Sequence, residues 1–267
     1  MTFQYIESVT QRSGEQQFPP IGDLLPSESG SPGSQQEVER ANPEAVMARY
    51  RFGAPHRGNT TDAVTDALRE AILDGALSPS TWLREDELAA SLQVSRTPVR
   101  EALRILADEK IVVKTAHHGT VVASMTLEDA LALYVVAENL EGVASRLAAV
   151  RCTPELVDRL HESQRRMALA VDHADVSALV AENLTFHRIL RTAAANPYLE
   201  RFLTQVEHAV RRIPTTFSIP GRATRVLGEH QAIIDAISVG DGDAAEALAK
   251  AHMHTARAMR LELMLGS

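Results

Sequence analysis

The sequence predicts a mainly α-helical protein with an N-terminal winged helix-turn-helix and a C-terminal antiparallel all-α bundle of about six helices. Its 267 residues exceed one typical domain and suit two. Apolar residues recur at helical spacing from residue 60 onward, interrupted by two short β-branched runs within residues 111–122. After Ser124 no strand pattern recurs, which favours a helical bundle for the second domain.

Composition narrows the class of protein. The 27 basic and 35 acidic residues give a formal net charge of −8, so DNA binding would depend on local clusters of basic residues. The single cysteine, Cys152, excludes a disulfide framework and a cysteine-rich zinc fold. No apolar run approaches the roughly 18 residues of a membrane span, and the N-terminus lacks the order of a signal peptide. We therefore expect a soluble cytoplasmic protein with no membrane partner.

The first 58 residues differ from the rest of the chain. They contain Pro19-Pro20, a stretch rich in Pro, Ser and Gly at residues 26–34, and little apolar periodicity. Such a segment cannot bury enough apolar surface to offset its ordering entropy. Residues 1–58 are therefore expected to be a mostly disordered extension, with a short helix compatible with the pattern near Val38–Tyr50.

Residues 59–124 carry the pattern of a winged helix-turn-helix. One helix runs from Thr60 to near Asp74-Gly75, a second spans about Glu85–Leu92, and a third follows Ser95, the expected N-cap. Two β-branched runs, Ile111–Lys114 and Thr120–Val122, then flank a turn at residues 117–119. Three helices followed by a hairpin predict this fold, with the hairpin as the wing.

Residues 125–267 predict the helical bundle. Helix starts are marked by Thr126 with Asp129 three residues later, by Thr153-Pro154, by Asp175 and by Asn196-Pro197. The six helices are expected near residues 127–150, 154–172, 176–193, 197–213, 222–238 and 242–264.

The third helix of the winged domain carries the pattern of a DNA-reading helix. Arg96, Arg100 and Arg104 follow one another at four-residue steps beside its apolar stripe. The free amides of a helix N-terminus suit phosphate, and the planar fork of Arg100 suits the two acceptors of guanine. The alternative is a solvated helix face with ordinary arginines. Seven basic and ten acidic residues give positions 59–124 a net charge of −3, so the basic residues must gather on one side.

Three histidines fall inside the apolar faces of three different bundle helices. His187 shares its stripe with Asn183 one turn earlier, while His230 and His252 lie in the stripes of the last two helices. Buried imidazoles need partners, and one divalent metal satisfies several at once. The alternative is that each is a core histidine bonded to a neighbour. Glu229 is expected to point away, about 100° around the helix from His230.

Three runs in the winged domain resemble the GntR family of bacterial transcription regulators. They are Ala67–Gly75, Leu83–Ala89 and Val94–Leu103. The second half resembles the ligand-binding FCD domain of the FadR subfamily. The residues that carry this resemblance are Leu140-Glu141, Leu147-Ala148-Ala149, Phe186-His187, Glu229-His230, and Gly240-Asp241 with His252.

The resemblance implies a homodimer that binds a short palindromic operator in double-stranded DNA and responds to a small effector, commonly by release of repression. It also implies a metal, since many FCD domains bind one through an aspartate and three histidines on these helices. Here Asn183 stands at the aspartate position. A neutral amide favours imidazole-preferring ions such as zinc or nickel. A carboxylate effector would then coordinate that metal. Pattern and resemblance together assign DNA contacts to Arg96, Thr97, Arg100, Arg104, Lys114, His118 and Gly119, and metal ligands to Asn183, His187, His230 and His252.

The chain departs from the family pattern at three positions. His118 precedes the wing-tip glycine where relatives often have arginine, and Asp86 stands where some place a DNA-contacting arginine. Ala137 replaces an arginine that faces the ligand pocket in relatives. Arg146 is the candidate to supply that charge to the effector, with an ordinary surface residue as the alternative.

Two other functions fit parts of the pattern. Three histidines with an open coordination position also describe catalytic zinc, as in a metal-dependent hydrolase, although a winged domain would then have no role and no enzyme is expected. A DNA-binding dimer whose bundle is purely structural is the third reading. A rise in melting temperature with ligand would separate a sensor from it.

Overall fold

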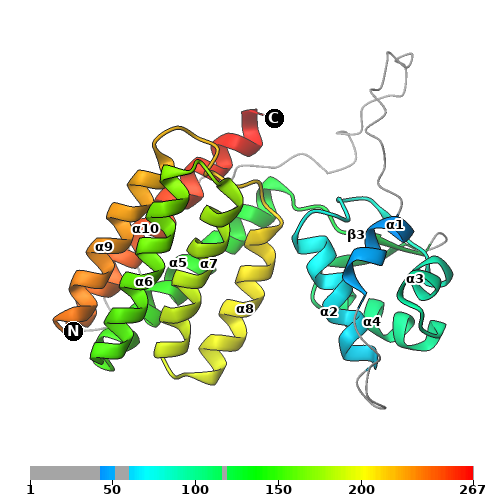
Figure 1. Ribbon diagram of the computed structural model, residues 1–267, viewed down its shortest axis with the longest axis horizontal. Coiled ribbons are helices and arrows are strands. Elements are labelled where there is room, and N and C mark those ends of the chain that lie inside the picture. The colour runs from blue at the N-terminus through cyan, green and yellow to red at the C-terminus, as the bar shows by residue number, and fades with distance from the viewer. Residues whose placement is uncertain (1–42, 52–59, 116–118, 267) are drawn as a thin grey trace, which may run out of the picture. The chain divides into compact units, whose positions relative to one another are not determined.

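The computed structural model describes residues 43–51, 60–115 and 119–266 (Figure 1). It confirms the mainly helical fold with a winged helix-turn-helix and a helical bundle. The elements of the winged domain are α1 (Pro43–Met47), η2 (Ala48–Tyr50), α2 (Thr60–Leu73), β1 (Trp82–Leu83), α3 (Glu85–Leu92), α4 (Arg96–Asp108), β2 (Val112–Thr115) and β3 (Gly119–Val122). Among the described helices, none is long and apolar enough to cross a membrane.

The winged domain has its own apolar core. Leu68 of α2, Leu88 of α3 and Leu103 of α4 are buried together in it. The sheet order is β1-β3-β2, with both pairs antiparallel, so β2 and β3 form the predicted wing. Strand β1 was not predicted, because two residues are too few to show a period-two pattern. Ser95 is the N-cap residue of α4, as expected, but its side chain makes no capping hydrogen bond.

Part of the segment expected to be disordered belongs to the winged domain. Met47 of α1 is fully buried in the winged core. The Tyr50 hydroxyl lies 3.2 Å from Oδ2 of Asp74, and Nε of Arg51 donates to the carbonyl oxygen of Ser91 at 2.6 Å. The winged domain therefore starts before the expected boundary at residue 59. The expectation for residues 1–42 and 52–59 lies outside the described residues.

The second domain is a bundle of six helices. They are α5 (Leu127–Val150), α6 (Pro154–Asp172), α7 (Val176–Ala193), α8 (Pro197–Arg211), α9 (Arg222–Ser238) and α10 (Gly242–Gly266). Only the ends of α8 and α10 differ from prediction, by two residues each. The predicted caps explain this agreement: Thr126 and Asp129 form a reciprocal capping box, and Thr153, Asp175 and Asn196 each accept a backbone hydrogen bond.

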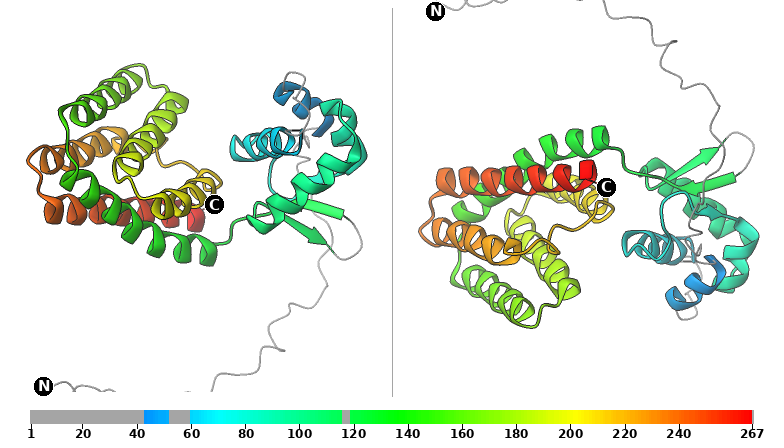
Figure 2. Two further views of the ribbon diagram at one scale, coloured as in Figure 1. Left: turned by 90° about the horizontal axis from the view of Figure 1, so that it is seen from below. Right: turned by 90° about the horizontal axis from the view of Figure 1, so that it is seen from above.

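Helix α10 lies alongside α5 over much of its length, and α9 packs against α6 and α10 (Figure 2). Phe186 of α7 and Ile233 of α9 are buried in the shared core. This packing aims the inner faces of α7, α9 and α10 at one another.

Candidate functional site

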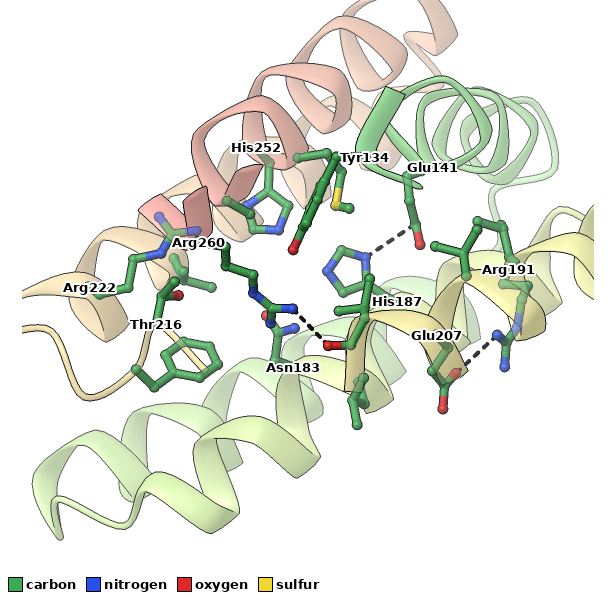
Figure 3. Close-up of a pocket in the computed structure, with 18 residues that line it drawn as sticks. Tyr134, Glu141, Asn183, His187, Arg191, Glu207, Thr216, Arg222, His252 and Arg260 are labelled. Carbon is green, nitrogen blue, oxygen red and sulfur yellow. Dashed lines mark hydrogen bonds and ion pairs between the residues drawn. The ribbon is translucent and has the colours of Figure 1, made fainter. Parts of the chain in front are cut away.

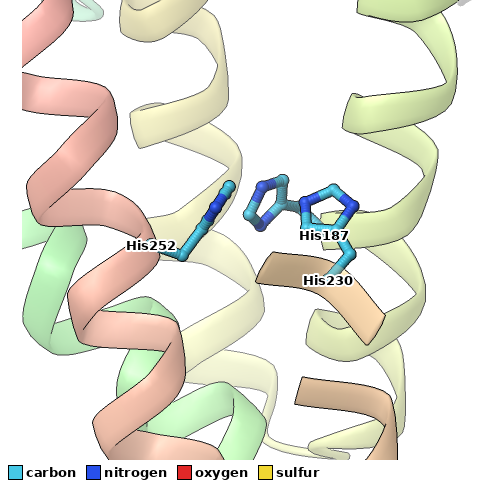
Figure 4. A group of neighbouring side chains, drawn as sticks. All are labelled: His187, His230 and His252. Carbon is cyan, nitrogen blue, oxygen red and sulfur yellow. The ribbon is translucent and has the colours of Figure 1, made fainter. Parts of the chain in front are cut away.

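Three helices of the bundle bring three histidines together. His187 comes from α7, His230 from α9 and His252 from α10 (Figure 4). Each offers a ring nitrogen, and these nitrogens all lie within 4.8 Å of one another. The structure thus brings together the three histidines that the apolar stripes single out, in a group that can hold a metal ion.

His230 is the most deeply buried of the three. Its side chain has no solvent exposure, and its ring stacks on Phe186 with centroids 3.7 Å apart and planes 8° apart. Among the described residues, neither ring nitrogen has a hydrogen-bond partner. Burial lowers the pKa of His230 well below its ordinary value, and the neighbouring histidines lower it further. The ring is therefore neutral at pH 7, the form in which imidazole binds metals.

The other two histidines are each bonded to a carboxylate at Nδ1. His187 Nδ1 lies 3.2 Å from Oε2 of Glu141, and His252 Nδ1 lies 2.7 Å from Oε2 of Glu229. These contacts leave Nε2 of both rings available. A carboxylate on the far nitrogen is the usual partner of a metal-binding histidine, because it fixes the tautomer and the ring orientation.

The expectation that Glu229 points away from the site was wrong. Its direction on α9 does differ from that of His230, but α10 packs against α9 and places His252 beside its carboxylate. Sequence reasoning considered each helix alone, so it missed Glu229 as a partner of a histidine on another helix. Glu141 was missed for the same reason, although both glutamates lie in the family motifs.

A pocket lies beside the histidines, in the interior of the bundle. Asn183 lines it one turn before His187 on α7, together with the buried Tyr134 of α5 and Thr216 of the loop before α9 (Figure 3). The empty space between the lining atoms, including its opening to solvent, is about 650 Å³. The pocket is thus partly open to solvent.

The arginines that line this pocket do not include Arg146, the residue expected there. Arg146 does not line it, contrary to expectation: its side chain is 49% exposed and pairs with Asp243 and Glu246 at 2.8 and 3.0 Å. The arginines that line the pocket are Arg191, Arg222 and Arg260. A signal for them was present, because each lies four or eight residues from a histidine of the cluster on the same helix and hence on the same face.

The predicted DNA-reading face of α4 is open to solvent. The side chains of Arg96, Arg100 and Arg104 are 64%, 60% and 58% exposed. Glu85 at the start of α3 lies 3.0 Å from Nη2 of Arg100 and 3.6 Å from Nη2 of Arg96, a partner that the helix pattern did not reveal. Thr97, Lys114 and Gly119 are exposed as well. His118 lies outside the described residues.

Family models match both domains. Residues 60–122 match the bacterial regulatory proteins of the gntR family, and residues 132–255 match the FCD domain. The chain is 31% identical to a protein from Paenarthrobacter nicotinovorans named "Probable D-xylose utilization operon transcriptional repressor", over 71% of this chain and 84% of that protein.

Two further relatives agree with this result. The gluconate operon transcriptional repressor of Bacillus subtilis strain 168 is 30% identical, over 69% of this chain and 78% of the repressor. A crystal structure of a GntR transcriptional regulator from Rhodococcus sp. RHA1 is 25% identical, with a TM-score of 0.62, and the match covers 78% of this chain and 98% of that one. This chain therefore belongs to the GntR family, as a ligand-responsive, DNA-binding transcriptional regulator with an FCD domain.

Proposed function

We propose that the FCD domain senses a carboxylate effector through a divalent metal held by His187, His230 and His252. The observation that carries this proposal is His230, a neutral imidazole with no exposure and no hydrogen-bond partner in the described part of the chain. A buried polar ring without partners is costly, and a metal ion would satisfy it.

The ligand set favours zinc or nickel. Three imidazoles form the core of the site, and Asn183 would add a neutral amide oxygen on the pocket side. Hard oxygen-preferring cations gain little from such a set, whereas imidazole suits zinc and nickel. The metal would supply a Lewis-acidic position for an effector carboxylate, and Glu141 and Glu229 would hold two of the rings in place.

Effector binding would change the affinity of the winged domains for DNA. A ligand that binds one arrangement of the protein better than another shifts operator binding by that difference. The Bacillus subtilis relative named above is a gluconate operon repressor, and the Paenarthrobacter relative is named as a probable repressor of a D-xylose utilization operon. We extend this role to the present chain: a cytoplasmic repressor that binds a short palindromic operator. An organic acid would relieve the repression.

A homodimer would match such an operator, and the outer face of α5 supports one. Leu131, Val135, Val136 and Val143 are 41%, 54%, 51% and 38% exposed on this helix. Apolar side chains gathered on one helix face are typical of a protein–protein interface. A second copy of the chain that buried this face would place two winged domains on two half-sites.

The arrangement of the glutamates supports the alternative function, a metal-dependent hydrolase, less well. Both glutamates near the histidines bond their Nδ1 atoms. A carboxylate in that position orients a metal ligand, whereas a general base must reach the water on the metal's open side.

Metal analysis by inductively coupled plasma mass spectrometry tests the proposal. Tag-free protein that has been loaded with zinc and desalted should retain about one ion per chain, and the double variant His187→Ala/His230→Ala should retain none. His254→Ala is the control, because His254 is on α10 only two residues from His252 but is 62% exposed. Retention of zinc by the double variant, or none in the wild type under replete conditions, would exclude this site.

A further inference from the structure

Three arginines share the pocket with His187 and His252 of the histidine cluster. Arg191 comes from α7, Arg222 from the first residue of α9 and Arg260 from α10. The side chains of Arg191 and Arg222 are only 9% and 2% exposed. In the described part of the chain, each of the three retains a buried Nε with no hydrogen-bond partner. Unsatisfied guanidinium donors in a pocket are a ready site for an anion.

Arg222 is held loosely by its own partner. Its Nη1 lies 3.3 Å from both carboxylate oxygens of Glu229, whereas Glu229 lies 2.7 Å from His252 Nδ1. The carboxylate therefore serves chiefly the histidine. Burial lowers the pKa of Arg222, although a guanidinium remains charged at neutral pH.

Arg260 extends into the same pocket from α10 (Figure 3). Its Nη1 donates to the carbonyl oxygen of Val210 at 2.9 Å, and its guanidinium carbon lies 6.0 Å from the centre of the Tyr134 ring. No carboxylate is among these partners, so the positive charge of Arg260 has no salt bridge in the described residues.

The charges around the pocket favour a ligand that carries two negative charges. Three arginines face Glu141 and Glu207 of the lining and Glu229 behind it. Glu207 also pairs with Arg188, and Glu229 with Arg225, so the side chains have no net negative charge. A divalent metal on the histidines would add two positive charges. Charges in a buried site are costly unless they are compensated, so a ligand that carries two negative charges would restore balance.

We propose that the effector is a small dianion, with one carboxylate at the metal and a second anionic group bound by Arg222 and Arg260. This inference rests on the metal site proposed above. The second group is a carboxylate, because the planar fork of arginine pairs with its two oxygens. A phosphate monoester in its place would bring the total charge to about −3 at neutral pH. Arg191, which Glu207 engages at 3.0 Å, is less available than Arg260.

Isothermal titration calorimetry of the zinc-loaded full chain with matched acids tests the inference. Malate and lactate are both 2-hydroxy acids, but only malate has a second carboxylate; succinate and butyrate form the corresponding pair without the hydroxyl group. At least one dianion should bind about tenfold or more tightly than its matched monoanion.

Variants of Arg260 test whether the preference for the dianion arises in this pocket. Arg260→Gln should remove the preference while monoanion affinity and zinc content stay unchanged, and Arg260→Lys should retain part of it because the charge remains. Arg257→Gln is the control, since Arg257 is one turn away on α10 and pairs with Glu138 outside the pocket lining. Thermal melts establish that each variant is folded.

Two results would overturn the inference in zinc-bound protein. One is that no dianion binds more tightly than its monoanion, which includes the case in which none of the four acids binds. The other is that Arg260→Gln weakens both members of a pair equally. If the wild type binds no zinc, only the proposed metal site is rejected. The same titrations on metal-free protein then test whether Arg222 and Arg260 bind the second anionic group. A preference for the dianion that depends on Arg260 would then support the anion site. If there is no such preference, the anion site is rejected.

Discussion

Oε2 of Glu229 lies 2.7 Å from Nδ1 of His252, on the neighbouring helix of the bundle. The same carboxylate lies 3.3 Å from Nη1 of Arg222. One side chain thus contacts both a proposed metal ligand and a proposed anion-binding residue. Glu229 would thus link the two parts of the proposed effector site, because a charge bound by Arg222 would change how firmly Glu229 holds the histidine ring.

Glu229→Gln should weaken zinc binding by about 10- to 100-fold, the usual cost of losing a carboxylate behind a metal-binding histidine. Competition with a chromophoric chelator measures the change. Glu246→Gln is the matched control, because Glu246 pairs with Arg146 and Lys250 outside the pocket lining. Equal zinc affinity in the wild type and Glu229→Gln would show that this contact does not support a metal.

The metal-free protein should lose stability as the pH falls below about 6.5, the ordinary histidine pKa. Burial lowers the pKa of both His230 and His252. Below pH 6.5 the unfolded chain therefore takes up protons that the folded rings do not, and the free energy of unfolding decreases by up to about 1.4 kcal/mol per pH unit for each ring. Above pH 6.5 both states are neutral and the effect vanishes.

Urea unfolding of chelator-treated protein at pH 7.5 and 5.5 measures this loss. His230→Leu should show a smaller loss than the wild type, because one of the two neutral rings is gone. A loss of the same size in His230→Leu would mean that this ring does not stay neutral in the fold.

Arg100→Ala should weaken binding to a selected operator by about 1–3 kcal/mol. The Arg100 side chain is 60% exposed on α4, so the fold should be unaffected. Fluorescence anisotropy with labelled duplex measures the affinity. Arg165→Ala on α6 is the control, since Arg165 is 66% exposed and pairs within its own helix. Unchanged operator affinity in Arg100→Ala would remove this residue from the DNA interface.

Glu85→Gln should strengthen binding to non-specific DNA at low salt, by about fivefold for a surface pair worth about 1 kcal/mol. The hydrogen bond from Arg100 lowers the pKa of Glu85, so its carboxylate is charged at neutral pH. That charge occupies Arg100 and Arg96 and repels phosphates. Glu87→Gln, which loses only a contact with Arg84, should change binding less. If Glu85→Gln weakens binding instead, Glu85 positions the arginines rather than competing with DNA.

Local patterns predicted the helices well because their ends depend on local chemistry. Thr126, Thr153, Asp175 and Asn196 cap helices from within the same few residues. The convergence of the three histidines was also predictable, because a residue inside an apolar stripe must face the bundle interior.

Contacts between helices were not predictable in this way. Glu229 reaches His252 only because α9 and α10 pack together, and Arg146 lies outside the pocket because acidic residues of α10 hold it at the surface. Met47 is buried by the winged core although its own segment shows little apolar periodicity. Each of these depends on tertiary packing, which a single helix pattern does not contain.

Anomalous diffraction from crystals of the zinc-loaded protein, collected on both sides of the zinc absorption edge, tests the central claim most directly. We expect one strong peak per chain, within about 2.0–2.1 Å of a ring nitrogen from each of His187, His230 and His252. A peak at other residues would contradict the proposed metal site. So would crystals grown with excess zinc that show no peak and in which His230 is hydrogen-bonded to protein groups or water.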